Sequence, residues 1–312
     1  MESDKRKVRT SLTIISIGLV LIMTFSLYMT YNINNNYKNE VSKYEEKTNE
    51  YNKLVSEKDN LIQTHSQLSD EITLITNIDE NISKRKEEVF SLASKLEQKI
   101  QNKESNYKIA YLTFDDGPYY LTYKYLETLK EKNVKGTFFT IGSGKTKCYD
   151  KSSYDCTKLY KAIVDAGHTI ANHTYSHAIF TGLYNSADSF INQINKQEDY
   201  IYEKTGVITN IARFPGGTAT AGRLKDKIKE KLREENYGWV DWTAADGDGG
   251  ALYSKSEAWE RFTKEIDEDI EVVLFHDYSS ITLSILPDAI DYLQERNYIL
   301  LPLFYESVAI EK

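Results

Sequence analysis

Strand-like and helix-like segments alternate from residue 109 to residue 303 of this 312-residue chain, and this alternation restricts its fold more than any other feature. Short apolar runs predict strands at residues 109–114, 136–141, 169–171, 211–214, 239–242, 272–275 and 299–303. Amphipathic segments predict helices at residues 121–132, 159–166, 186–204, 223–235, 255–266 and 283–294. This order indicates an α/β fold with a parallel sheet, in which functional residues gather at the carboxyl ends of the strands.

The N-terminal segment has the composition of a membrane anchor. Residues 1–9 contain four basic residues, and residues 10–31 carry no charge and are rich in Ile, Leu, Val and Met. An apolar run of this length can cross a bilayer as a helix, and its basic flank predicts a cytoplasmic N-terminus. The alternative is a cleaved signal peptide, but no small-x-small cleavage site follows the run. We therefore expect a single-pass anchor at residues 10–31, with the rest of the chain outside the membrane.

Residues 32–106 are predicted to form a helical stalk. Residues 36–103 contain neither Pro nor Gly, and apolar residues recur there every seven positions, at Leu54, Leu61, Leu68, Ile75, Ile82 and Val89. Residues 77–81 are the expected break. The pattern leaves three arrangements open: a self-associating coiled coil, a hairpin, or a helix packed on the globular domain. The net charge of −8 argues against a nucleic-acid partner.

Two adjacent aspartates, Asp115 and Asp116, end the first predicted strand, and Gly117-Pro118 follows at once. Successive strand side chains point to opposite faces, so both carboxylates reach one site only if the backbone turns there. Like charges held together are costly unless a cation or a donor offsets them. A metal site is therefore the first interpretation. The alternative is a pair of aspartates that caps the following helix.

Downstream residues strengthen the metal-site interpretation. His173 and His177 are four residues apart, a spacing that places both imidazoles on one face of a helical turn. Imidazole and carboxylate together suit zinc or another divalent transition ion. Arg213, Asp241 and His276 each lie at the end of a further predicted strand. Each alone fits a structural role, but parallel strands would bring them to the rim that carries Asp115 and His173.

Five segments, taken in order, resemble the motifs of the polysaccharide deacetylase family, also described as the NodB homology domain or carbohydrate esterase family 4. They are Thr113-Phe114-Asp115-Asp116-Gly117, His173-x-x-x-His177, Arg213-x-Pro215, Asp241-Trp242 and Leu274-x-His276. The resemblance covers residues 107–312 and implies a deformed (β/α) barrel. With the anchor and the stalk, it implies a peptidoglycan N-acetylglucosamine deacetylase on the outer face of the membrane of a Gram-positive bacterium. N-acetylmuramic acid, chitooligosaccharides and poly-N-acetylglucosamine remain alternative substrates, and a non-catalytic glycan-binding scaffold is the alternative class.

The resemblance also implies a role for each residue of the predicted site. Asp116, His173 and His177 would hold a divalent metal, for which zinc is the default and cobalt, nickel and manganese are alternatives. Asp115 would be the general base that takes a proton from the attacking water. The remaining roles concern three residues: Arg213 would keep Asp115 ionised, His276 would be the general acid, and Asp241 would raise the pKa of His276.

The chain departs from the family pattern where many members have Tyr or Trp after the proline of the Arg-x-Pro motif. Here that residue is Gly216. Its backbone N–H could still stabilise the oxyanion, and Pro215, Trp242 and Leu274 complete the predicted substrate-binding set. An aromatic wall of the sugar groove is missing, and its stacking role would fall to Phe214, Trp242 or Tyr119.

Cys148 and Cys156 lie in a polar insertion at residues 142–157. A short-loop disulfide is compatible with a location outside the membrane, and two free thiols are the alternative.

Overall fold

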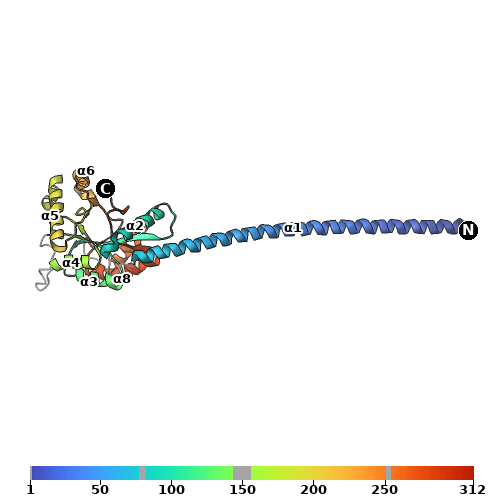
Figure 1. Cartoon of the computed structure of the whole chain (residues 1–312), viewed down its shortest axis with the longest axis horizontal. Coiled ribbons are helices and arrows are strands. Elements are labelled where there is room, and N and C mark those ends of the chain that lie inside the picture. The colour runs from blue at the N-terminus through green and yellow to red at the C-terminus, as the bar shows by residue number, and fades with distance from the viewer. Residues whose placement is uncertain (1, 77–81, 143–155, 251–253) are drawn as a thin grey trace. The chain divides into compact units, whose positions relative to one another are not determined.

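The computed structural model describes residues 2–76, 82–142, 156–250 and 254–312, which form two compact units, 1–69 and 70–312 (Figure 1). The predicted break at residues 77–81 and the predicted disulfide partner Cys148 lie outside the described residues. Helix α1 (Glu2–Thr76) runs from the first unit into the second.

Helix α1 includes one stretch that is apolar enough to cross a membrane. Within Leu12–Ser66, an 18-residue window has a mean hydropathy of 2.2, and none of it is buried in the protein. Four hydroxyl groups along this stretch donate to backbone carbonyls three or four residues earlier, and they belong to Thr13, Ser16, Thr24 and Thr30. These hydroxyls would therefore stay hydrogen-bonded inside a bilayer. This helix is compatible with a single-pass anchor.

Helix α2 (Ile82–Gln101) packs on the α/β domain, one of the three arrangements that the heptad pattern left open. Its buried face consists of Val89, Ala93, Leu96 and Ile100, and the ring of Phe90 stacks on Phe304 at 4.8 Å between centroids. We predicted residues 32–106 as stalk and the domain from residue 107. In the structure the compact unit begins at Asp70, because α2 contributes to the core.

A buried carboxylate on α2 connects the helix to the rest of the domain. Glu97 accepts hydrogen bonds from the hydroxyl groups of Tyr111 and Ser307, both at 2.5 Å, and from the backbone N–H of Val308 at 3.2 Å. Burial raises the pKa of Glu97, and these hydrogen bonds oppose the rise. Tyr111 lies on the strand that also carries Asp115 and Asp116, so one side chain joins α2, that strand and the C-terminal segment.

Replacing Glu97 with alanine should lower the free energy of unfolding by about 1–3 kcal/mol, since Tyr111 and Ser307 would keep buried hydroxyls that lose their acceptor. The midpoint of denaturant unfolding measures this loss. Glu104→Ala, at an exposed position just after α2, is the matched control and should stay within about 0.5 kcal/mol of the parent. Equal losses in the two variants would contradict the role of Glu97.

The sheet is parallel throughout its named strands and has β1 (Lys108–Gly117) at its centre. The order is β5 (Gly238–Trp239), β4 (Ile211–Ala212), β3 (Thr169–Asn172), β2 (Thr137–Thr140), β1, β7 (Ile270–His276) and β6 (Ala244–Ala245). Strand β7 pairs with one edge of β1, and the other edge pairs with β8 (Tyr298–Leu300) at its start and β2 at its end. The predicted (β/α) architecture is confirmed as a curled parallel half-barrel.

The helices follow the strands as predicted, with ends set by local capping. They are α3 (Thr122–Glu131), α4 (Thr157–Asp165), α5 (Ala187–Thr205), α6 (Lys225–Glu234), α7 (Lys255–Glu265) and α8 (Ser280–Glu295). The hydroxyls of Ser186, Ser254 and Ser279 accept backbone N–H groups in the first turns of α5, α7 and α8. Gly206 adopts a left-handed conformation and ends α5.

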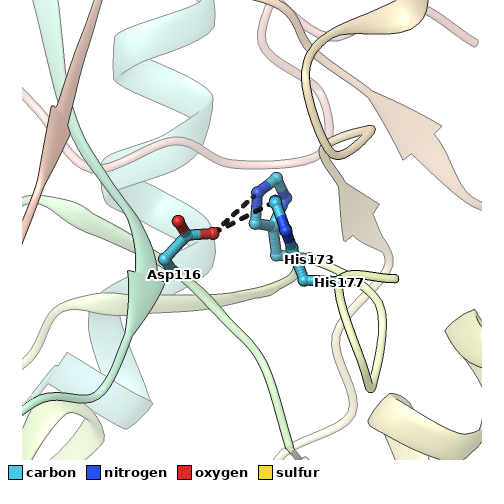
Figure 2. A group of neighbouring side chains, drawn as sticks. All are labelled: Asp116, His173 and His177. Carbon is cyan, nitrogen blue, oxygen red and sulfur yellow. Dashed lines mark ion pairs between the residues drawn. The ribbon is translucent and has the colours of Figure 1, made fainter. Parts of the chain in front are cut away.

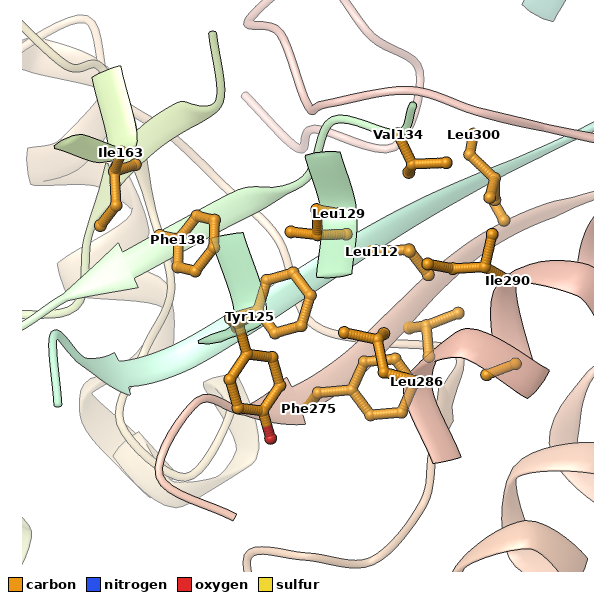
Figure 3. Close-up of a cluster of buried hydrophobic side chains, with 14 of the residues drawn as sticks. Leu112, Tyr125, Leu129, Val134, Phe138, Ile163, Phe275, Leu286, Ile290 and Leu300 are labelled. Atoms are coloured by element: carbon orange, nitrogen blue, oxygen red, sulfur yellow. The ribbon is translucent and has the colours of Figure 1, made fainter. Parts of the chain in front are cut away.

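The main core lies between β1, β2, β7 and the helices α3 and α8 (Figure 3). The ring of Phe114 stacks on Phe138 at 4.8 Å and on Phe275 at 6.0 Å, and meets Tyr125 edge-on at 5.4 Å. These residues come from β1, β2, β7 and α3. The strand that ends in Asp115 and Asp116 is therefore fixed on both sides by close-packed aromatic rings.

Candidate active site and metal centre

Strand β1 bulges at its end, and this bulge turns Asp115 and Asp116 toward one site. The pairing register with β2 shifts between Asp115 and Gly117, and Asp116 has a left-handed backbone with φ of +70°. The predicted turn at this point is confirmed. Gly117 is required because a Cβ there would collide with the carboxylate of Asp277, which is fully buried behind it.

The two histidines converge through a loop, so the predicted helical turn is wrong. Strand β3 ends at Asn172, and residues 173–178 form no regular helix. Thr174 and His177 both have positive φ values, of +64° and +48°. The side chain of Asn172 accepts the N–H of Thr174, and the hydroxyl of Thr174 accepts the N–H of His177. These bonds hold the rings of His173 and His177 at 4.9 Å between centroids.

Asp116, His173 and His177 form a group that could hold a metal ion, with their ligand atoms all within 4.8 Å of one another (Figure 2). Asp116 Oδ1 lies 3.4 Å from His173 Nε2 and 3.2 Å from His177 Nε2. His173 Nδ1 lies 2.9 Å from the carbonyl oxygen of Arg213, which can only accept. The proton of this ring is therefore on Nδ1, and the lone pair of Nε2 faces Asp116.

Two further observations fit a divalent transition ion at this group. Asp116 Oδ1 is buried and has no hydrogen-bond partner among the described residues, a costly state that a cation would relieve. Burial raises the pKa of Asp116, but the close approach of His173, His177 and His276 outweighs it and holds this pKa well below its usual range. Burial, with the neighbouring His173, lowers the pKa of His177 to about 4. An ionised carboxylate and neutral imidazoles are the states that ligate metal.

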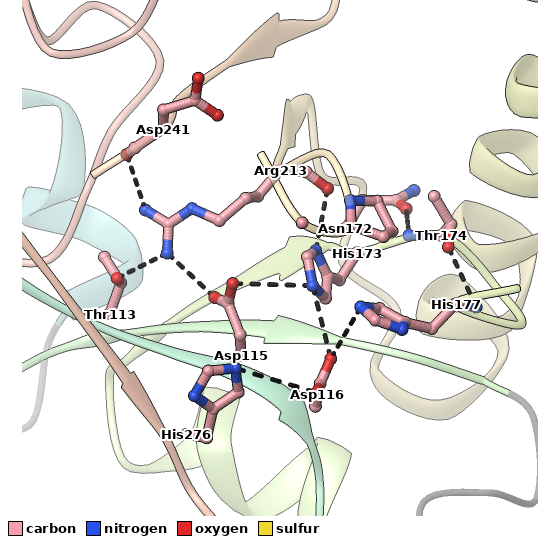
Figure 4. Close-up of polar contacts among 12 residues, drawn as sticks. Thr113, Asp115, Asp116, Asn172, His173, Thr174, His177, Arg213, Asp241 and His276 are labelled. Atoms are coloured by element: carbon pink, nitrogen blue, oxygen red, sulfur yellow. Dashed lines mark hydrogen bonds and ion pairs between the residues drawn. The ribbon is translucent and has the colours of Figure 1, made fainter. Parts of the chain in front are cut away.

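Asp115 is paired with the fully buried guanidinium of Arg213 (Figure 4). Arg213 NH1 donates to Asp115 Oδ1 at 2.9 Å and to the hydroxyl of Thr113 at 2.7 Å. Its remaining nitrogens donate to the carbonyls of Val240 and Asp241, both at 3.1 Å. The other carboxylate oxygen of Asp115 lies 3.6 Å from His173 Nε2. One oxygen of Asp115 is thus fixed by Arg213. The other faces His173, one of the three residues that could hold a metal ion.

His276 approaches the same group from the end of β7, where Asp115 is its partner in the β1–β7 register. His276 Nε2 lies 3.9 Å from Asp116 Oδ2, while Nδ1 lies 2.6 Å from Asp248 Oδ1. The second oxygen of Asp248 accepts the backbone N–H of His276. Burial lowers the pKa of His276, but the hydrogen bond and the charge of Asp248 outweigh it and raise this pKa to about 9.

The predicted partner of His276, Asp241, is wrong and is replaced by Asp248. The carboxylate of Asp241 accepts the backbone N–H and the hydroxyl of Thr218, at 3.0 and 2.5 Å, on the far side of Arg213. Asp248 follows β6, a strand of two alanines that the apolar pattern did not reveal. The sequence feature that could have indicated Asp248 is the segment Asp246-Gly247-Asp248-Gly249, whose residues are typical of a turn. This turn follows β6 and places Asp248 at the carboxyl end of that strand.

Asp248→Asn should move the alkaline limit of activity to a pH about 1–3 units lower, because the variant removes the charge that holds the proton on His276. His276 must be protonated to act as the predicted general acid, so activity should be present below its pKa and lost as the pH rises through that pKa. A pH profile of kcat/KM measures the change. Asp241→Asn is the matched control and should leave the alkaline limit in place; a shift in that variant alone would restore the original assignment.

The predicted substrate-binding residues differ in their environments. The carbonyl of Pro215 accepts the hydroxyl of Tyr184 at 2.8 Å, and Gly216 is exposed with a φ of +76°. Leu274 is buried on β7, and Trp242 is 37% exposed. Phe214 is fully buried in the core, so its proposed stacking on a sugar is wrong.

An aromatic pair flanks His276 on another side. The ring of Tyr278 lies 5.1 Å from the ring of His276, and Tyr119 packs edge-on against Tyr278, also at 5.1 Å. Tyr119 therefore remains a stacking candidate. The N-terminal end of α4 carries Cys156, which is buried, and its predicted partner Cys148 falls outside the described residues.

The fold is that of a class of carbohydrate-modifying hydrolases, and known proteins of similar sequence and structure support this class. A family model described as polysaccharide deacetylase matches residues 102–234. The peptidoglycan-N-acetylmuramic acid deacetylase PdaA of Bacillus subtilis is 30% identical over 197 residues, which cover 61% of this chain and 68% of that protein. The chain belongs to the polysaccharide deacetylase family.

Other family members give the same picture. A peptidoglycan-N-acetylglucosamine deacetylase of Bacillus cereus is 28% identical over 229 residues, which cover 69% of this chain and 78% of that protein. The catalytic domain of peptidoglycan N-acetylglucosamine deacetylase from Eubacterium rectale superposes with a TM-score of 0.59 at 26% identity, covering 66% of this chain and 93% of that one. A CE4 family pseudoenzyme from Bacillus anthracis also superposes, with a TM-score of 0.53 at 25% identity over 64% of each chain.

Proposed function

We propose that this protein is a metal-dependent deacetylase that hydrolyses the acetamido group of N-acetylglucosamine in peptidoglycan and releases acetate. The observation that carries the proposal is the convergence of three elements on one rim. These are the Asp116, His173 and His177 group, the Asp115–Arg213 pair and the His276–Asp248 pair. A base, an acid and a set of metal ligands within reach of one another are what amide hydrolysis needs.

Asp115 is the proposed general base. A divalent cation held by Asp116, His173 and His177, with zinc as the default, would polarise the amide carbonyl and acidify water. Asp115 accepts the proton of the attacking water through the oxygen that faces the group, while Arg213 holds the other oxygen in place. The backbone N–H of Gly216 is the proposed donor to the oxyanion.

His276 is the proposed general acid. Asp248 binds the Nδ1–H, so the proton that can be transferred is on Nε2, the nitrogen that faces the centre. As the C–N bond breaks, this proton goes to the leaving nitrogen, which departs as the free amine of glucosamine. The new C–O bond leaves acetate as the second product. A pKa of about 9 keeps His276 protonated at neutral pH.

N-acetylmuramic acid is the second candidate substrate, because the relative PdaA, named for that activity, is 30% identical. The test is to incubate the purified full-length protein, loaded with zinc, with peptidoglycan. Acetate is then quantified, and mass spectrometry of the released muropeptides identifies the sugar that lost its acetyl group. Loss from N-acetylglucosamine supports the proposal, and loss from N-acetylmuramic acid alone would replace it with the alternative.

A non-catalytic glycan-binding scaffold is the remaining class, and the pseudoenzyme with a similar fold is the reason to test it. Membership of the family does not by itself guarantee turnover. The base, acid and ligand residues present here argue for an enzyme. Binding of peptidoglycan without any acetate release, at several metals, would assign the chain to the scaffold class.

We further propose that the N-terminus is cytoplasmic and that the catalytic domain lies outside the membrane, facing the cell wall. The basic residues before the apolar stretch support this orientation. The exposed apolar residues of α1 beyond the anchor, among them Tyr44, Tyr51, Leu54 and Leu61, support self-association through the stalk.

A further inference from the structure

The loop that follows β6 contacts the proposed general acid His276 through two neighbouring residues. Asp248 holds His276 by two bonds: its Oδ2 accepts the backbone N–H at 2.7 Å, and its Oδ1 lies 2.6 Å from the ring Nδ1. The ring also lies against Gly249, where a Cβ would be only 2.8 Å from its Cε1. The direction of the imidazole therefore depends on the conformation of residues 246–249.

A threonine of α8 bonds to both acidic residues of this loop. Thr282 Oγ1 lies 2.7 Å from Asp246 Oδ2 and 2.8 Å from Asp248 Oδ2. The backbone N–H of Asp248 adds a longer bond to Asp246 Oδ1, at 3.2 Å. Thr282 and Asp246 are fully buried, and Asp248 is buried as well. The hydroxyl of Thr282 thus connects the loop to the first turn of α8.

This first turn is fixed to the main core. The backbone N–H of Thr282 donates at 3.1 Å to the hydroxyl oxygen of Ser279, the residue that caps α8. The hydroxyl of Tyr125, a core residue of α3, lies 2.6 Å from the carbonyl oxygen of Ser279 and 3.1 Å from that of His276. Because His276 and Thr282 are held by the same rigid part of the domain, Thr282 is a fixed point for the loop.

The hydroxyl of Thr282 also has an electrostatic role. Two carboxyl groups side by side repel each other when both are ionised, and this repulsion favours turning Asp248 away from Asp246. A hydroxyl between them opposes this movement, since it offers a proton to a carboxylate oxygen. Without it, Asp248 Oδ2 loses a buried hydrogen bond, and the side chain that orients His276 is less firmly held.

We propose that Thr282 is a positioning residue of the general acid: it holds Asp248 in the orientation that directs His276 Nε2 to the leaving nitrogen. The inference rests on the proposed function, in which His276 gives that proton as the C–N bond breaks. It predicts that loss of the Thr282 hydroxyl harms only substrates whose leaving group needs a proton. A sugar amine is such a leaving group, whereas nitrophenolate leaves without a proton.

The test compares soluble peptidoglycan fragments with the ester 4-nitrophenyl acetate, using the full-length protein loaded with zinc. Thr282→Val keeps the shape of the side chain and removes the hydroxyl. It should lower kcat for acetate release from the peptidoglycan fragments about 10–100-fold, with KM changed less than about 2-fold. The kcat for the ester should change less than about 3-fold. Thr282→Ser, which keeps the hydroxyl, should restore most of the activity on peptidoglycan.

The matched control is Thr263→Val in α7, where the lost hydroxyl donates to the carbonyl of Trp259 within the same helix. It should leave both rates within about 2-fold of the parent. If Thr282→Val does not fold at the assay temperature, Thr282→Ala, which also lacks the hydroxyl, takes its place.

Equal losses on the two substrates in the variant that lacks the hydroxyl of Thr282, or an unchanged rate on peptidoglycan, would overturn the positioning role. The activity of the parent protein would still uphold the proposed function in that case. A parent protein that releases no acetate from peptidoglycan would overturn the proposed function and this inference together.

Discussion

Asp115→Asn should lower kcat for acetate release by about 10²–10⁴-fold, the contribution of a positioned general base. Asparagine keeps the shape of the side chain, and its carbonyl can still accept from Arg213, but it cannot take a proton from water. The proposed metal ligands are untouched, so metal content after dialysis should equal that of the parent protein. Acetate assays and elemental analysis of the same preparation measure both quantities.

The fold of the Asp115→Asn variant needs its own control, because Arg213 is fully buried and loses its counter-charge. Breaking a buried ion pair can cost about 3–5 kcal/mol of stability. Retained metal, together with an unfolding midpoint above the assay temperature, shows that the site is intact. Asp241→Asn, on the far side of Arg213, is the matched substitution and should keep most activity. Substantial turnover by Asp115→Asn would remove Asp115 from the role of base.

The sheet could be predicted because its central strands are buried on both faces. Residues 109–114 and 272–275 are continuous apolar runs, which a surface segment would not carry. Strands β4 and β5 are only two residues long, and the predicted ranges continued to Phe214 and Trp242. The residues beyond these short strands are apolar but do not pair in the sheet: Phe214 packs in the core, and Trp242 is partly exposed. Strand β6 consists of two alanines and carries no periodic signal.

The convergence of Asp116, His173 and His177 could be predicted from their places after strands, but the backbone that achieves it could not. The left-handed conformations of Asp116 and His177 could not be assigned from residue type, because Asp and His adopt this conformation more often than most residues but still in a minority of cases. They depend on a register shift in β1 and on the hydrogen bonds from Asn172 through Thr174, which require the neighbouring strands. The assignment of Asp241 as the partner of His276 failed for the same reason.

The heptad pattern of helix α2 is compatible with two kinds of packing partner. A heptad stripe buries one face of a helix, and the partner can be another helix or a domain surface. The buried side chains of Val89, Leu96 and Ile100 are compatible with either partner. The deciding residue is Glu97, which shares that face and finds its donors on Tyr111 and Ser307. Those donors are remote in the sequence, so only the folded domain reveals them.

His177→Ala should abolish stable metal binding and, with it, activity. Loss of an outer hydrogen-bond partner of a metal ligand typically costs about 10–100-fold in affinity, and loss of a direct ligand from a set of three should cost more. His177 is the better target than His173, since its side chain is 26% exposed. His173 is buried and donates to the carbonyl of Arg213, so its removal would also disturb the ion pair between Arg213 and Asp115.

Elemental analysis after dialysis should find little metal in His177→Ala and a full complement in Asp115→Asn, although both variants are inactive. Addition of excess zinc should restore part of the activity of His177→Ala, because Asp115, Arg213 and His276 remain in place, and none of the activity of Asp115→Asn. This opposite response separates a defect in metal affinity from a defect in proton transfer. Unchanged metal content in His177→Ala would refute its assignment as a ligand.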